Sequence, residues 1–259
     1  MEIKLLKKEK GKDIFLVKGV TPQYINTIRR YIVEEVPTMA IDTVKFIENS
    51  SAMYDEIIAH RLGLVVLKTD LKSYNLKEEC KCKGKGCPRC QTTLVLDKKG
   101  PCMVYAEDLK PKDPKIKPVY PKTPIVKLLE GQRLKIEATA TLGRGKEHVK
   151  FSPAWCYYYG YPKIEIKNCK GSGKCVEYCP KGILKLEKKK VKVTKIVECT
   201  LCKACEEACP NGAIKVNPSD KDFIFIIEPW GQLSSKDILN KAIEIFNNHL
   251  DQLIKGLKK

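Results

Sequence analysis

Two cysteine runs of the same spacing constrain this chain more than any other feature. The second run reads C-x-x-C-x-x-C-x-x-x-C-P, and the first repeats it thirty residues earlier with a serine in place of one cysteine. The second run contains Cys199, Cys202, Cys205 and Cys209, and the first contains Cys169, Ser172, Cys175 and Cys179. Closely spaced thiolates are soft ligands that can hold several corners of an iron–sulfur cube. The sequence therefore predicts an iron–sulfur module.

The serine decides how many complete clusters the two runs can hold. In ferredoxins with two clusters, the fourth cysteine of each run binds the cluster of the other run. By that rule one complete 4Fe–4S site is formed by Cys179, Cys199, Cys202 and Cys205.

The second site is incomplete under the same rule. It contains Cys169, Cys175 and Cys209, and Ser172 stands where a fourth thiolate belongs. A serine hydroxyl is a harder and far less acidic ligand than a thiol. The sequence leaves open a 3Fe–4S or 4Fe–4S cluster, a disulfide such as Cys175–Cys209, or thiols without metal.

A third group of cysteines lies in a glycine-rich segment at residues 80–90, which we term the knuckle. It consists of Cys80, Cys82, Cys87 and Cys90. Four thiolates suit tetrahedral zinc, and closed sites of this kind stabilise loops that have no apolar core. One residue separates the first pair, which is tighter than usual, so two disulfides or unligated thiols remain alternatives. Cys102 and Cys156 have no ligand spacing, and we expect them to pack as small apolar residues.

Length and composition limit the number of domains and indicate the cellular compartment of the protein. The 259 residues can form two or three small domains with separate cores. No stretch approaches about twenty apolar residues, and no apolar signal stretch follows Met1, so we expect a cytoplasmic protein without a membrane span. The formal charge of +18 is spread along the chain without interleaved aromatic residues. We therefore expect a lysine-rich surface and no sequence-specific nucleic-acid contact.

Hydrophobic periodicity predicts an α+β fold. Strands are expected at residues 3–10, 13–18, 39–48, 133–142 and 222–228, and a hairpin at 183–186 and 190–193. Helices are expected at 22–36, 54–64 and 236–258, with Thr21 and residues 234–237 as N-terminal caps. Residues 105–125 are rich in proline and lysine and predict a loop. The terminal strand and helix are expected to rejoin the N-terminal elements, so that the middle and the module are insertions.

Both terminal helices carry an apolar stripe. In the first helix Ile25, Ile28 and Ile32 recur at helical spacing beside the basic pair Arg29 and Arg30. The C-terminal stripe includes Leu239, Phe246, Leu250 and Leu253. A terminal helix this long, striped on one side, needs a partner surface, either in its own domain or in a second chain.

Three segments resemble the signatures of RNA polymerase assembly subunits of the alpha type. Residues 26–30 (N-T-I-R-R) with 36–42 (V-P-T-M-A-I-D) resemble the alpha motif, residues 54–64 the second signature and residues 143–151 the third. With the iron–sulfur insert, the whole chain resembles the archaeal D subunits of this family, counterparts of bacterial alpha and of the eukaryotic third-largest subunit. The eukaryotic relatives carry a zinc knuckle at nearly the spacing of residues 80–90.

The resemblance implies a non-catalytic assembly scaffold in three parts. These are a discontinuous dimerisation domain (1–45 plus 220–259), an inserted mixed α/β middle domain (46–163) and a ferredoxin-like iron–sulfur domain (164–219). In the family, the dimerisation domain pairs with the small subunit L, and the heterodimer recruits the small subunits N and P and the large B subunit. The two apolar stripes are then the two-chain core, and the arginine pair contributes contacts within the polymerase. Losing iron would remove a cross-link from a module with little apolar core, so the cluster is expected to stabilise the chain, with regulation by oxidation as a further hypothesis.

The sequence contains no recognisable catalytic constellation. The three histidines lie in unrelated contexts, and no nucleophile motif or phosphate-binding glycine loop occurs. The main rival interpretation is a ferredoxin-like electron-transfer protein or an oxidoreductase subunit. It is weaker because one cysteine run is incomplete and no dinucleotide-binding fingerprint is present. A free-standing nucleic-acid-binding protein ranks third.

Overall fold

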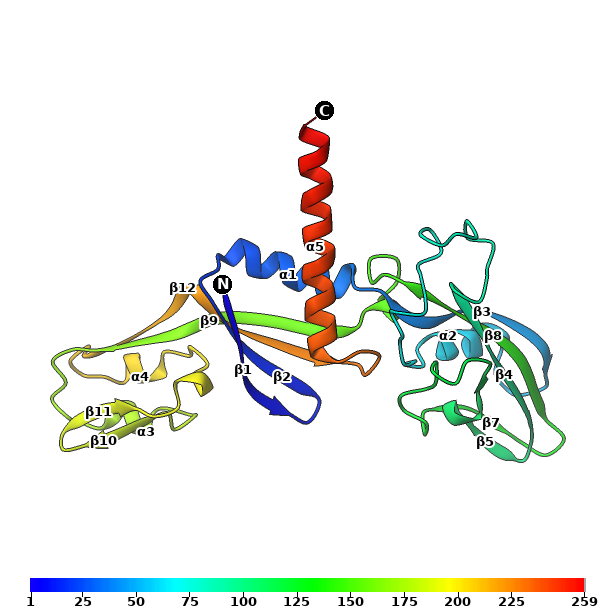
Figure 1. The fold of residues 1–259 in the computed structure, drawn as a ribbon. Helices are drawn as coiled ribbons and strands as arrows, with labels where there is room; N and C mark the ends of the chain where they lie inside the picture. The colour runs from blue at the N-terminus through cyan, green and yellow to red at the C-terminus, as the bar shows by residue number, and fades with distance from the viewer. Residues whose placement is uncertain (259) are drawn as a thin grey trace. The chain divides into compact units, whose positions relative to one another are not determined.

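The computed structural model describes residues 1–258, which form two compact units (Figure 1). The first unit contains Met1–Thr27 and Tyr157–Ile226, and the second contains Ile28–Cys156 and the C-terminal segment from Ile227. Helices and antiparallel sheets are both present, which confirms the predicted α+β class. Among the described residues, no helix is long and apolar enough to cross a membrane.

One four-stranded sheet forms the framework of the first unit. The chain opens with a hairpin of β1 (Glu2–Glu9) and β2 (Lys12–Lys18), which turns at Gly11 with a φ of 88°, a conformation that glycine adopts readily. The hairpin belongs to a four-stranded sheet with the order β1-β2-β12-β9. Its other strands are β9 (Ala154–Ile166) and β12 (Ile214–Pro229). β12 begins well before the strand predicted at residues 222–228, and β9 was not predicted. Leu16, Ile224 and Ile226 are buried on this sheet.

The iron–sulfur module is also part of the first unit and contains little regular structure. Its helices are one turn each, and its strands form a single hairpin: α3 (Lys174–Glu177), β10 (Leu184–Glu187), β11 (Lys190–Val193), η3 (Ile196–Glu198) and α4 (Ala204–Glu207). The hairpin turns at Lys188 and Lys189, whose φ angles of 47° and 61° suit a two-residue hairpin turn. The predicted hairpin is therefore confirmed.

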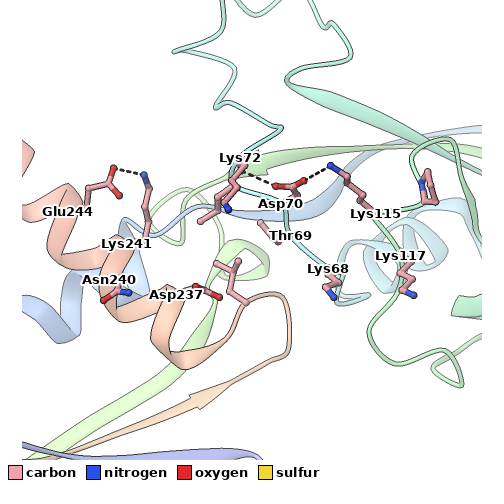
Figure 2. Close-up of a pocket in the computed structure, with 13 residues that line it drawn as sticks. Lys68, Thr69, Asp70, Lys72, Lys115, Lys117, Asp237, Asn240, Lys241 and Glu244 are labelled. Carbon is pink, nitrogen blue, oxygen red and sulfur yellow. Dashed lines mark hydrogen bonds and ion pairs between the residues drawn. The ribbon is translucent and has the colours of Figure 1, made fainter. Parts of the chain in front are cut away.

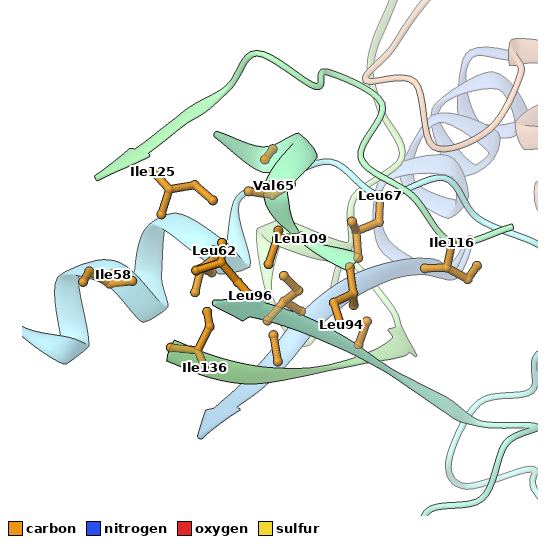
Figure 3. Packing of buried hydrophobic residues seen from close by; sticks show 14 of the residues in the cluster. Ile58, Leu62, Val65, Leu67, Leu94, Leu96, Leu109, Ile116, Ile125 and Ile136 are labelled. Atoms are coloured by element: carbon orange, nitrogen blue, oxygen red, sulfur yellow. The ribbon is translucent and has the colours of Figure 1, made fainter. Parts of the chain in front are cut away.

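A four-stranded antiparallel sheet with the order β3-β8-β4-β6 supports the second unit. Its strands are β3 (Thr38–Asn49), β4 (Gln91–Lys99), β6 (Lys110–Pro111) and β8 (Arg133–Gly143), and a smaller sheet pairs β5 (Cys102–Tyr105) with β7 (Pro124–Leu128). Figure 3 shows α2 (Asp55–Gly63) packing its buried Ile58 and Leu62 over Leu96 and Ile136. Full burial of each such side chain stabilises the fold by about 1.5–3 kcal/mol, and none of the buried residues of this core is a cysteine.

The two long helices begin where the sequence predicts. α1 (Pro22–Glu34) starts after Thr21, whose Oγ1 accepts the N–H of Tyr24 at 3.3 Å. α5 (Ser235–Leu257) starts after Ser234, whose Oγ accepts the N–H of Asp237 at 3.2 Å. Each cap satisfies a backbone donor that the helix itself leaves unpaired.

The predicted loop at residues 105–125 is only partly correct. The short helix η1 (Ala106–Asp108), strand β6 and the start of β7 lie within it. The segment folds back on itself, since Ala106 N–H donates to the Thr123 carbonyl at 2.9 Å and Glu107 N–H donates to that of Pro121 at 3.0 Å. Such pairings depend on the tertiary fold and leave no periodic pattern in the sequence.

Candidate metal centres

The knuckle cysteines meet at the spacing of a tetrahedral metal site. Their four Sγ atoms lie within 4.8 Å of one another. The Sγ–Sγ distances are 3.5 Å for Cys80–Cys87 and Cys80–Cys82, 3.6 Å for Cys82–Cys90 and 3.9 Å for Cys87–Cys90. Zinc–sulfur bonds of about 2.3 Å place the sulfurs of a tetrahedron about 3.8 Å apart. The four thiols therefore fit one tetrahedral ion, and an all-sulfur ligand set favours zinc.

Tight turns hold the knuckle in this shape. Lys83 and Gly84 have φ angles of 52° and 77°, and Gly86 has 86°. A Cβ atom at Gly86 would lie 2.6 Å from the side chain of Gln91, so that residue would have to move. The N–H of Cys87 donates to Cys90 Sγ at 3.2 Å, an interaction that favours a thiolate there.

The knuckle thiols perturb one another strongly. Burial raises the pKa of Cys82, but its hydrogen bonds with the thiol groups of Cys80 and Cys90 outweigh burial and lower that pKa to about 6. Burial raises the pKa of Cys90 to about 12, with hydrogen bonds to Cys82 and Cys87 adding to the rise. One thiolate thus makes ionisation of the next unfavourable. A divalent cation resolves this conflict, because it offsets the negative charge of the ligands that surround it.

The cysteines expected to form the complete cluster site line one cavity of the first unit. Cys179, Cys199, Cys202 and Cys205 surround it together with Ile183 and Val216. Cys205 lies on α4 and Cys179 follows α3. Four cysteines around one cavity supply the four thiolates that a 4Fe–4S cube requires.

Electrostatics at this cavity also favour a cationic occupant. Burial raises the pKa of Cys205 to about 11, and charge on Cys179, Cys199 and Cys202 raises it further. Burial likewise raises the pKa of Cys199. Four thiolates are stable here only when positive iron compensates them, so the residues present fit a 4Fe–4S cluster.

The three cysteines of the incomplete site are also neighbours. Burial raises the pKa of Cys175, and charge on Cys209 and Cys169 adds to the effect. Burial opposes ionisation of Cys209, but backbone N–H groups at residues 211–214 outweigh it and lower its pKa, including Ala213 N–H at 3.3 Å. Ser172 is exposed. All thirteen cysteines are free thiols, so the structure contains neither the Cys175–Cys209 disulfide nor the knuckle disulfides weighed above.

The two cysteines outside these groups behave as packing residues. Cys156 is buried, and burial raises its pKa to about 12, which keeps the thiol neutral. Cys102 is partly buried against the core of the second unit and lies 3.5 Å from the Lys99 carbonyl oxygen.

The residues expected at a two-chain interface differ in how much of each side chain is exposed to solvent. Ile25, Ile28 and Ile32 are at most 3% exposed, and Leu239 is 9% exposed, so the chain itself already covers these four side chains. Arg29 is half-buried, whereas Arg30 is exposed and pairs with Glu34 at 3.2 Å. Phe246 packs edge-on against Tyr31, with ring centroids 5.2 Å apart. The open part of the stripe is at the end of α5, with these exposed fractions: Leu250 40%, Leu253 60%, Ile254 48% and Leu257 79%.

Sequence reasoning missed the ion pairs that anchor the knuckle. Arg144 follows β8 and is mostly buried. It lies 3.0 Å from Glu79, 3.6 Å from Glu78 and 3.8 Å from Glu35. Glu79 directly precedes Cys80, and Glu35 follows the end of α1. One side chain therefore links the knuckle to the end of α1.

The segment that carries Arg144 reaches the end of α1 through its backbone as well. Lys146 N–H donates to the Glu34 carbonyl at 3.1 Å, and its ammonium group pairs with Glu35 at 3.0 Å. A Cβ atom at Gly145 would lie 1.9 Å from the Val33 carbonyl oxygen, so the contact requires glycine. Gly145 was the available signal in the sequence for this close approach.

Known protein families match both the middle part of the chain and the iron–sulfur module. Residues 39–153 match the family described as RNA polymerase Rpb3/RpoA insert domain, and residues 168–213 match the family described as 4Fe-4S dicluster domain. Proteins named DNA-directed RNA polymerase subunit Rpo3 are similar over the full length. The one from Methanothermobacter thermautotrophicus is 42% identical over 98% of both chains. Those from Archaeoglobus fulgidus and Pyrococcus horikoshii are 39% and 37% identical, over 100% of this chain and 98% of their own. With this identity along its whole length, the chain belongs to the family of DNA-directed RNA polymerase subunit Rpo3.

Proposed function

We propose that this chain is a non-catalytic assembly subunit of an archaeal DNA-directed RNA polymerase. The observation that carries the proposal is the full-length similarity to Rpo3 subunits, which includes the insert domain and both cysteine runs. The chemistry of nucleotide addition then belongs to other subunits, and this chain supplies surfaces on which they assemble.

The proposed first step of assembly is pairing with the small subunit L. It uses the discontinuous dimerisation domain, residues 1–45 plus 220–259, and its contact surface includes the exposed apolar end of α5. Leucine and isoleucine side chains left open in a row at the end of a long helix are typical of a surface that a second chain covers. The pair then adds the small subunits N and P and the large B subunit.

The metals are proposed to be structural. One 4Fe–4S cluster is held by Cys179, Cys199, Cys202 and Cys205, and it cross-links the two halves of a module with few apolar residues. Zinc is held by the knuckle, where it supplies four bonds to a loop made largely of turns. The incomplete site at Cys169, Cys175 and Cys209 is not needed for this role.

Co-expression with subunit L followed by anaerobic native mass spectrometry tests the proposal. We expect a one-to-one heterodimer whose added mass corresponds to about four irons with their sulfides and one zinc. The chain expressed alone is the control, and it should self-associate or precipitate through the open end of α5. A stable monomer that ignores L but is reduced and reoxidised reversibly would favour an electron carrier instead.

A further inference from the structure

A groove of about 660 Å³ lies in the second unit beside the N-terminal half of α5 (Figure 2). Its other wall consists of two loops, residues 68–72 and 114–117. The loops are fastened to each other by the Lys68 N–H, which donates to the Lys117 carbonyl at 2.9 Å. They are fastened to the segment before α5 by the Thr69 N–H, which donates to the Gln232 carbonyl at 3.1 Å. Backbone hydrogen bonds therefore hold the walls of the groove in place.

Lysines outnumber carboxylates in the lining of the groove, by five to three. The lysines that line it are Lys68, Lys72, Lys115, Lys117 and Lys241. Two of them are neutralised, since Lys115 pairs with Asp70 at 3.2 Å and Lys241 pairs with Glu244 at 2.8 Å. The other three have no carboxylate partner among the described residues. The free rim lysines, which we define as Lys68, Lys72 and Lys117, are thus available to an anionic ligand.

The groove is also lined by apolar and acidic residues, and this mixture favours a peptide over a nucleic acid as its ligand. Leu71, Pro114 and Leu233 supply apolar surface. Asp70 and Asp237 contribute negative charge beside the lysines. A nucleic-acid backbone has phosphates at every step and would meet these carboxylates unfavourably. An extended peptide alternates its side chains, so carboxylates can face the lysines while apolar side chains rest against the leucines.

We propose that this groove binds an extended acidic segment of another polymerase subunit, an inference that rests on the proposed function. Carboxylates of the segment pair with the free rim lysines, and an apolar side chain between them packs against Leu71 and Leu233. Because the loops and the start of α5 both contact the segment, its binding joins the inserted middle domain to the C-terminal helix.

Lysine footprinting of the assembled polymerase tests this inference. Acetylation rates are measured by mass spectrometry for the free chain and for the purified enzyme that contains it. We expect the free rim lysines to react at least about tenfold more slowly in the enzyme, while Lys185 on β10 and Lys190 on β11 serve as exposed references. Zero-length carbodiimide coupling, which joins amines to touching carboxylates, should link Lys68 or Lys117 to an Asp or Glu of another subunit.

A charge-reversal pair supplies the matched control. Lys68→Glu/Lys117→Glu should weaken the retention of the cross-linked partner by about tenfold, whereas Lys185→Glu/Lys190→Glu, at exposed positions of the β10–β11 hairpin, changes the net charge equally and should not. Equal acetylation of the free rim lysines in chain and enzyme would overturn the inference, as would protection that appears only when DNA or RNA is added. If the chain fails to enter the polymerase at all, the proposed function itself is wrong, so the two failures are distinguishable.

Discussion

The open end of α5 gives the most direct prediction about assembly. Replacing Leu253 and Leu257 with aspartate should abolish pairing with subunit L without unfolding the chain. Both leucines are mostly exposed in the isolated chain, at 60% and 79%. Substitutions at such positions usually change the free energy of unfolding by less than about 0.5 kcal/mol.

The expected loss of affinity follows from the area that a partner would cover. Full burial of a leucine side chain stabilises by about 1.5–3 kcal/mol, so covering the exposed fractions of these two contributes about 3 kcal/mol together. Removing that contribution raises Kd by more than about 100-fold. Placing a carboxylate in an apolar interface adds a desolvation cost to the loss.

The assay is titration of labelled subunit L with each variant, with circular dichroism to verify that α5 remains helical. The matched control is Gln252→Asp/Lys255→Gln, which changes the net charge by the same amount at exposed polar positions of α5. We expect the control to bind L within about threefold of the native chain, a difference of less than about 0.7 kcal/mol. If the leucine variant binds as tightly as the control, the end of α5 is not the interface and the reasoning fails.

Four further predictions concern the metals and the loops. Cys90→Ser should lose most of the single zinc measured by elemental analysis, whereas Cys102→Ser should keep it; full zinc in both would refute the knuckle assignment. Cys205→Ala should remove the iron and the visible absorbance of the cluster, again with Cys102→Ser as the control. Arg144→Met should lower the free energy of unfolding by about 1–3 kcal/mol and speed hydrogen exchange at the end of α1. An unchanged exchange rate there would show that Arg144 does not couple the knuckle to α1. Hydrogen bonds from Ser73 and from the Lys72 backbone lower the pKa of Asp70 to about 2. Its stabilisation is therefore present above pH ~4 and lost as the pH falls through 2, so Asp70→Asn should lower Tm at pH 6 and leave it unchanged near pH 2.

Local signals in the sequence were sufficient for the helices and the ligand runs. Thr21 and Ser234 mark helix starts because capping is a short-range interaction, and it occurs at both positions. The cysteine spacings are a local signal of the same kind, since Cys199, Cys202 and Cys205 lie within a loop and one helical turn. Pairing between distant strands has no such signal. β12 begins well before the predicted strand at 222–228, and β9 was not predicted at all. Each carries a proline, Pro218 or Pro162, that argues against a strand.

The apolar stripes show a second limit of prediction from sequence, which is that periodicity does not tell buried positions from exposed ones. Periodicity finds Ile28 on α1 and Leu253 on α5 equally well. It does not reveal that Ile28 is 3% exposed in the folded chain while Leu253 is 60% exposed. What covers a stripe is decided by tertiary contacts, so only the structure separates the core of this chain from the surface left for a partner.

The two metal centres should differ in what their loss does, because the cores around them differ. The core of the second unit contains 22 buried residues and no cysteine, so zinc loss is expected to loosen the knuckle and leave that core folded. The core of the module contains eight buried residues, of which three are cysteines: Cys175, Cys199 and Cys205. Without iron, the cysteines of this core become free thiols and no longer cross-link the module. The five other buried side chains are apolar, and they are too few to keep the module folded alone. Cys202, one of the proposed cluster ligands, is exposed, and this exposure would give oxidants a route to the cluster. Of the two proposed metals, iron is therefore the one whose loss by oxidation is expected to lower the amount of folded first unit, and with it the amount of chain able to assemble.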